Sequence, residues 1–191
     1  FNSVEDHATC LVIQPDGRIV VAGTSFISNN SDMSVARFTS TGGLDPTFDG
    51  DGKAVVSFGS TSDVARGVSL QAVDGKIVLA GSTDVAGGHR VALARLTGNG
   101  ALDTAFDGDG KLVTTLAGFA TAITRESAIP GSRGEGGAPE KFVVAGTLDP
   151  GYTVFLARFN LGGTLDAAFD GDGVATRTFT QPPSLGNLFV T

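Results

Sequence analysis

Apolar and polar residues alternate along the chain in short segments that have the period of β-strands. In the middle of the chain these segments are 64–71, 76–83, 90–97 and 111–118. Turn sequences such as VDG, VAGG and DGDG separate them. No segment carries a sustained apolar stripe of helical period. The pattern therefore predicts an all-β protein built from units of four short strands.

The four-strand unit occurs three times. The decapeptide LDPTFDGDGK at 44–53 returns as LDTAFDGDGK at 102–111 and as LDAAFDGDGV at 165–174. Asp49 and Asp107 are 58 positions apart and Asp107 and Asp170 are 63 apart, the surplus lying in the loop around 130–140. A period of this length indicates an array of supersecondary units that bury their faces against one another.

The second and third strands of each unit are apolar on both faces, which favours sheets packed between neighbouring sheets. Four-stranded sheets stacked in this way are the blades of a β-propeller. We expect one repeat domain, 1–191, with three blades. Their predicted bounds are about 4–60, 61–118 and 119–180, followed by a closing tail at 181–191.

The repeat also resembles a known family. QPDGRIVVAG, then SVARF, then TGGLDPTFDGDGKAVVSF closely resembles the delta-60 repeat, a β-propeller repeat of large secreted or surface-associated bacterial proteins. The resemblance covers the chain from about Asp6 to Phe179, and only the third copy departs from it, where IPGSRGEGGAPEKF replaces a short turn. It implies a propeller fold and an extracellular or periplasmic location in a bacterium, and it says little about chemistry.

The acidic decapeptide allows two interpretations. Calcium prefers six to eight oxygen ligands, and acidic loops with glycine often supply them, although the spacing of an EF-hand is absent. Alternatively, the first Asp caps a turn, the Phe packs into the blade, and DGDG forms a tight turn. Arg37, Arg95 and Arg158 lie in apolar strands and need carboxylate partners, which favours the second interpretation. The candidate calcium ligands are Asp45, Asp49, Asp51, Asp103, Asp107, Asp109, Asp166, Asp170 and Asp172.

Ligands of propellers usually bind at the mouth of the central channel. If the first strand of each unit is innermost, Asp6 and Asp63 occupy equivalent places, with Ala122 in the third copy, and Arg66 corresponds to Arg125. In a hydrolase, carboxylates at such a mouth hold a calcium ion that polarises the substrate. The candidate catalytic residues are then Asp6, His7 and Asp63. The other predicted residues of this mouth are Glu5, Arg66, Arg125, Glu126, His89 and Tyr152.

Composition narrows the choice of function. The net charge of −7, with no run of Lys or Arg, argues against binding of nucleic acid, and no apolar run reaches the roughly 20 residues of a membrane span. There is no G-x-S-x-G motif and there are only two His residues. We therefore favour a non-enzymatic binding or scaffold module of a secreted bacterial protein. One alternative is a calcium-dependent hydrolase of esters, lactones or phosphotriesters, with its site in the central channel of an assembled six-bladed propeller. The other is a purely structural array that calcium stabilises.

Three blades do not complete a ring, because closed propellers have about 4–8 blades. Two apolar sheet faces would otherwise meet water. We expect that the chain is part of a longer propeller or forms a homodimer with six blades.

Overall fold

The computed structural model describes residues 1, 5–27, 29–126, 140–150 and 153–179. These residues form strands and turns only, so the all-β prediction is confirmed. The predicted closing tail and the mouth residue Tyr152 lie outside the described residues.

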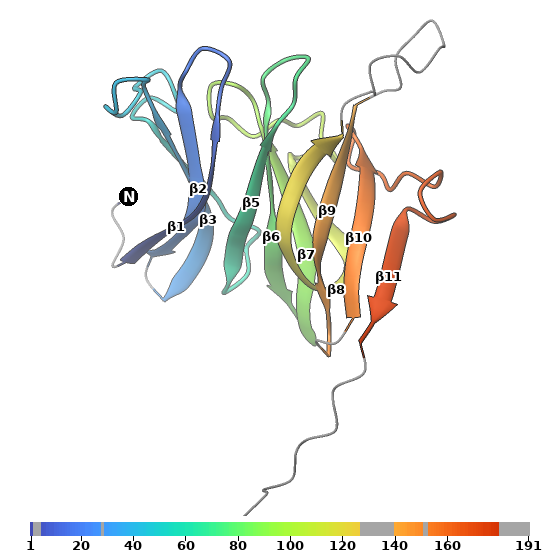
Figure 1. Cartoon of the computed structure of the whole chain (residues 1–191). Helices are drawn as coiled ribbons and strands as arrows, with labels where there is room; N and C mark the ends of the chain where they lie inside the picture. The colour runs from blue at the N-terminus through green and yellow to red at the C-terminus, as the bar shows by residue number, and fades with distance from the viewer. Residues whose placement is uncertain (2–4, 28, 127–139, 151–152, 180–191) are drawn as a thin grey trace, which may run out of the picture.

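The described strands form three antiparallel four-stranded blades (Figure 1). Blade 1 contains β1 (Glu5–Ile13), β2 (Ile19–Ile27), β3 (Asn30–Phe38) and β4 (Lys53–Val56). Blade 2 contains β5 (Asp63–Leu70), β6 (Ile77–Val85), β7 (Gly88–Leu96) and the first half of β8 (Lys111–Glu126). Blade 3 contains the second half of β8, β9 (Lys141–Leu148), β10 (Thr153–Asn160) and β11 (Val174–Thr178).

Strand β8 belongs to two blades. It pairs with β7 as far as Ala117 and with β9 from Gly118 onward, which joins blades 2 and 3 in one hydrogen-bonded sheet. Gly118 has a φ of 143°, and a Cβ there would lie 2.2 Å from the carbonyl oxygen of Thr147. Only glycine fits this bend. Blades 1 and 2, in contrast, are connected by the loop 57–62.

The core lies in two layers, one between each pair of neighbouring blades. Val20 and Val35 of blade 1 pack in one buried cluster with Ile77 and Leu79 of blade 2. The second cluster joins the other face of blade 2 to Phe142, Val144 and Phe155 of blade 3. Small and β-branched residues on both faces of the middle strands allow each sheet to be covered twice.

Strands β1, β5 and the second half of β8 are the innermost strands, as the sequence analysis assumed. Each forms one edge of its blade, and β1 and β8 both lie beside β5. Each has a bulge at the same place, between Ala8 and Cys10, between Ala65 and Gly67, and between Ala120 and Ala122.

The bulges correct the alignment of the third copy. They place Gly118, rather than Ala122, at the position of Asp6 and Asp63. They likewise place Thr121, rather than Arg125, at the position of Arg66. The reason is that β8 runs into blade 3 without a loop, so the third innermost strand begins earlier than the spacing of the repeats suggests.

Candidate functional site

The first Asp of each decapeptide holds two cationic side chains. Oδ2 of Asp45 lies 2.8 Å from Nε of Arg37 and 2.9 Å from Nε of Arg18. Asp103 pairs in the same way with Arg95 and Lys76, and Asp166 pairs with Arg158 and Lys141. All three carboxyl groups are buried. The predicted pairing of the strand arginines with the decapeptide is confirmed.

These contacts keep the three carboxyl groups ionised. Hydrogen bonds from the side chain and the N–H of Thr47 lower the pKa of Asp45. Burial alone raises the pKa of Asp103, but hydrogen bonds from Lys76 and the Ala105 N–H outweigh it and leave that pKa below its usual value. Burial also raises the pKa of Asp166. The hydrogen bond from the Ala168 N–H and the charges of Lys141 and Arg158 have the larger effect, so that this pKa is lowered overall.

The other decapeptide aspartates shape the turn. Asp49, Asp107 and Asp170 each have a φ of 50°, in the left-handed region that Asp tolerates better than most residues. The third Asp of each copy accepts a backbone N–H two residues later, for example Asp51 from Lys53 at 2.9 Å. The other two such bonds are Asp109 with Lys111 and Asp172 with Val174. Within the described residues, no group of three or more His, Cys, Asp or Glu side chains is placed to hold a metal ion. Calcium binding stays a prediction.

The candidate carboxylates at the starts of the innermost strands anchor the segments that enter the blades. Asp63 is fully buried and accepts hydrogen bonds from the N–H of Phe58 at 2.7 Å, from Ser60 and from Thr83. Asp6, one repeat earlier, has its carboxylate 3.7 Å from the amino group of Phe1. Asp63 therefore offers no exposed surface to a ligand.

The candidate histidines lie at the same end of the blades. His7 is exposed beside Glu5, with 3.1 Å between Nε2 and the carboxylate. His89 Nδ1 lies 2.6 Å from Oδ1 of Asp84, and both side chains line a surface pocket with Ser60. Arg66 is exposed at the bulge of β5.

Arg125 and Glu126 lie at the other end of the innermost strands. Nε of Arg125 is 3.6 Å from Oε1 of Glu140, and Glu126 is 3.4 Å from Nη1 of Arg158. The structure does not bring Arg125 and Glu126 together with Asp6, His7 and Asp63. The reason is that the second half of β8 runs along blade 3 from Gly118 before it reaches Arg125.

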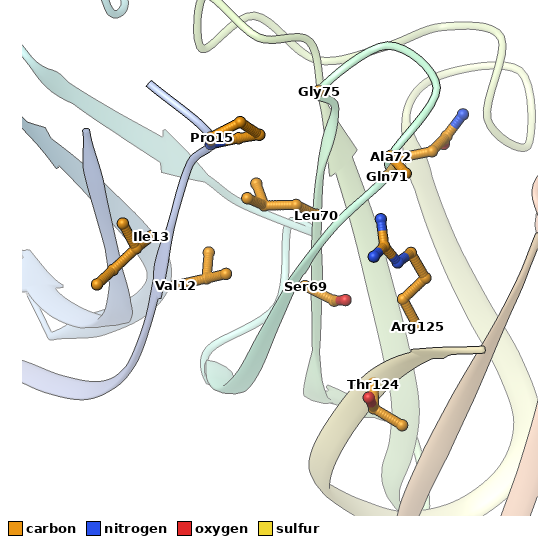
Figure 2. Close-up of a pocket in the computed structure, with 10 residues that line it drawn as sticks. All are labelled: Val12, Ile13, Pro15, Ser69, Leu70, Gln71, Ala72, Gly75, Thr124 and Arg125. Carbon is orange, nitrogen blue, oxygen red and sulfur yellow. The ribbon is translucent and has the colours of Figure 1, made fainter. Parts of the chain in front are cut away.

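A pocket of about 400 Å³ opens where the three innermost strands end (Figure 2). Val12 and Ile13 of β1 and Leu70 of β5 supply apolar surface, and Arg125 reaches from β8 toward the turn that carries Gln71. This end also carries the decapeptides, so it lies opposite the end where the sequence analysis placed the candidate catalytic residues.

Gln71 is the unusual polar residue of the pocket. It is buried, its backbone N–H donates to the carbonyl of Lys76, and its side-chain Oε1 has no hydrogen-bond partner among the described residues. Nearby, the carboxylate of Glu140 accepts the N–H of Ala72 at 2.9 Å. A buried acceptor without a donor is uncommon and costs free energy. Gln71 was not predicted from the sequence, although LVIQ at 11–14 and VSLQ at 68–71 repeat a Gln after the strand.

Comparison with protein families identifies the class of protein. The family model described as a domain of unknown function (DUF5122) beta-propeller matches residues 14–48, 74–106 and 141–169, together just over half of the chain. The chain belongs to this β-propeller repeat family. The finer likeness to the delta-60 repeat stays a resemblance. No curated protein matches the chain.

In the described part of the chain, no helix is long and apolar enough to cross a bilayer.

Proposed function

We propose that the chain is a non-enzymatic binding module of a secreted bacterial protein and that its ligand occupies the pocket at the ends of the innermost strands. The unsatisfied carboxamide oxygen of Gln71 carries this proposal: it is buried as the side chain stands, and a ligand that turns the side chain toward the pocket and donates a hydrogen bond to this oxygen removes the cost of the buried acceptor. The pocket volume lies within the range of roughly 300–1,000 Å³ usual for small-molecule sites.

The lining indicates the chemistry of the ligand. Gln71 offers an acceptor, and Arg125, whose charge Glu140 partly balances, offers N–H donors. A secondary amide both donates and accepts a hydrogen bond, and an apolar substituent on it can contact Val12 and Leu70. We infer that the ligand is a small amide with an aliphatic side chain, such as a piece of a peptide.

Calorimetric titration with N-acetyl-leucine methylamide tests the proposal, with the methyl ester of N-acetyl-leucine as the analogue that has one N–H fewer. We expect the amide to bind the natural protein and to lose most of its affinity in Gln71→Leu. Gln14→Leu is the matched control, because the Oε1 of Gln14 also lacks a partner but Gln14 does not line the pocket. Equal binding by both variants, or none to the natural protein, contradicts the proposal.

A second candidate function rests on the pair formed by Asp84 and His89. A carboxylate on Nδ1 holds the ring so that Nε2 faces outward as a base, which a hydrolase of esters, lactones or phosphotriesters needs. Screening these substrates with calcium and with a chelator tests it. Under this hypothesis His89→Gln abolishes turnover. Alanine variants of Asp6, His7 and Asp63 test the residues that the sequence analysis nominated.

A further inference from the structure

The two seams between neighbouring blades repeat the same contacts, and among the described residues each half of that seam is present once more, without its counterpart, at one end of the array. We propose that blade 3 of one molecule docks on blade 1 of a second copy of this chain through this repeated seam. Figure 1 shows blades 1 and 3 at opposite ends of the molecule, with blade 2 between them.

The first contact of the seam is an aromatic side chain that packs on a glycine of the next blade. Phe48 is buried against Gly100, where a Cβ would lie 3.2 Å from the ring, and Phe106 is buried against Gly163 at 3.1 Å. The third member, Phe169, is only half-buried.

The glycine that corresponds to Gly100 and Gly163 in blade 1 is Gly42. A Cβ at Gly42 would meet nothing within 4 Å. Blade 3 therefore presents Phe169 without its glycine, and blade 1 presents the glycine without its Phe.

The second contact is a hydrogen bond from the strand arginine to a carbonyl of the next blade. Nη1 of Arg37 donates to the carbonyl oxygen of Gly98, and Nη1 of Arg95 donates to that of Leu161. Arg158 is stacked on Phe169 at 4.9 Å, as Arg95 is on Phe106, but its Nη1 lies 3.4 Å from Glu126 of its own blade.

The carbonyl equivalent to those of Gly98 and Leu161 is that of Ser40, on blade 1. It lies in the same turn as Gly42. The acceptor turn of blade 1 therefore matches both groups that blade 3 presents.

The third contact is the apolar sheet face. Val91 and Leu93 of blade 2 are 0% exposed beneath blade 3. Their equivalents on the outer face of blade 3, Val154 and Leu156, are 42% and 44% exposed.

The opposite face shows the same difference. Val68 and Leu70 are partly buried against the cluster between blades 1 and 2. Their equivalents on blade 1, Leu11 and Ile13, are 61% and 62% exposed. Side chains at equivalent positions of the repeat are thus covered between neighbouring blades and exposed on the outer faces of blades 1 and 3.

Phe1 repeats at blade 1 a contact that Phe58 makes at the internal seam. Phe58 lies 6.0 Å from Nζ of Lys111 at the seam between blades 1 and 2, and Phe1 lies 6.0 Å from Nζ of Lys53 on the open face of blade 1. Phe1 leaves Leu11 and Ile13 exposed, so there is room for a sheet beside it.

A second copy is the occupant that these observations favour, because one chain supplies both halves of the seam. Two copies related by a two-fold axis form the seam twice and contain six blades. That number lies within the range of about 4–8 for closed propellers.

Light scattering after size exclusion tests the proposal over a wide range of protein concentration. We expect twice the chain mass of 19.3 kDa. Phe169→Ala should raise the dissociation constant of the dimer at least tenfold. Phe106→Ala is the matched control, because it removes the same side chain from an internal seam and should lower the melting temperature at every concentration.

A mixing experiment tests the direction of docking. Leu156→Glu and Leu11→Glu place a charge on the outer face of blade 3 and of blade 1, and each variant alone should be monomeric. Mixed together they restore one unaltered seam, so a dimer should return. A natural protein of 19.3 kDa at every concentration overturns the proposal, as does any mass other than two chains. A dimer broken by Leu11→Glu but not by Leu156→Glu also overturns it, because blade 1 would then meet blade 1.

Discussion

Nε of Arg95 donates a hydrogen bond to Oδ2 of Asp103 at 2.6 Å, and both side chains are buried where β7 meets the second decapeptide. Lys76 approaches the same oxygen at 3.1 Å. The decapeptide is therefore held to its blade by charge as well as by the packing of Phe106.

We predict that Arg95→Met lowers the free energy of unfolding by about 2 kcal/mol, the usual contribution of a hydrogen bond to a charged group. Arg177→Met, at an exposed position of β11, is the control and should change it by less than about 0.5 kcal/mol. Urea denaturation followed by circular dichroism measures both. An equal effect of the two substitutions would show that the buried pair adds nothing.

Acid should weaken the fold through the first Asp of each decapeptide. The pKa values of Asp45, Asp103 and Asp166 are lowered in the folded protein, so their contribution is present above the unfolded value of about 3.9 and is lost as the pH falls through the lowered values. The melting temperature should fall steeply below about pH 4.

Asp103→Asn should make this pH dependence shallower. Asp107→Asn is the control, because Asn tolerates the φ of 50° at that position. At the alkaline end, Lys76 has a raised pKa because of hydrogen bonds from its ammonium to Asp74 and Asp103, so its contribution is lost above about pH 10.4. Melting curves from acid to alkaline pH check both limits.

The third Asp of the decapeptide should act through its turn. Asp51→Ala, Asp109→Ala and Asp172→Ala each remove the acceptor of one backbone N–H, and each should cost about 1 kcal/mol of stability. A chelator should leave the melting temperature unchanged. A large fall with chelator that these substitutions abolish would establish the calcium interpretation instead.

Gly118→Ala should be among the most destabilising substitutions in the chain. It combines a φ of 143° with a clash against the carbonyl of Thr147, and we expect a loss of more than about 2 kcal/mol. Gly59→Ala, in the connection between blades 1 and 2, has a φ of 79° but open space, so it should cost only about 1 kcal/mol. Similar losses at both positions would mean that backbone strain alone is responsible.

Much of the fold could be read from the repeats. The second copy predicts strands at 64–71, 76–83, 90–97 and 111–118, and the structure has β5, β6 and β7 within two residues of the first three. The fourth prediction matches the half of β8 that belongs to blade 2, but it did not show that the same strand continues to Glu126 in blade 3. Gly118 marks the end of the predicted strand, but no local signal shows that the chain continues as a strand with a new partner, since Phe119 and Ala120 are ordinary strand residues.

The candidate site was less accessible to the same reasoning. Asp6 and Asp63 were correctly aligned with each other. However, Asp63 is fully buried and accepts hydrogen bonds from Phe58 and Thr83. Arg125 lies near the end of β8, at the end of the innermost strands that is far from Asp6. It lines the same pocket as Gln71 only because β5 and β8 lie side by side.

The sequence by itself determined the strand-and-turn unit, its three copies and the Arg–Asp pairing, because these depend on residues close together in the chain and on the cost of burying a charge without a partner. Only the tertiary structure decided which strand is shared between blades, which carboxylates are buried and where the pocket lies. Those features depend on side-by-side packing of β1, β5 and β8, whose contacts join residues more than 50 positions apart, such as Thr9 and the carbonyl of Ala65.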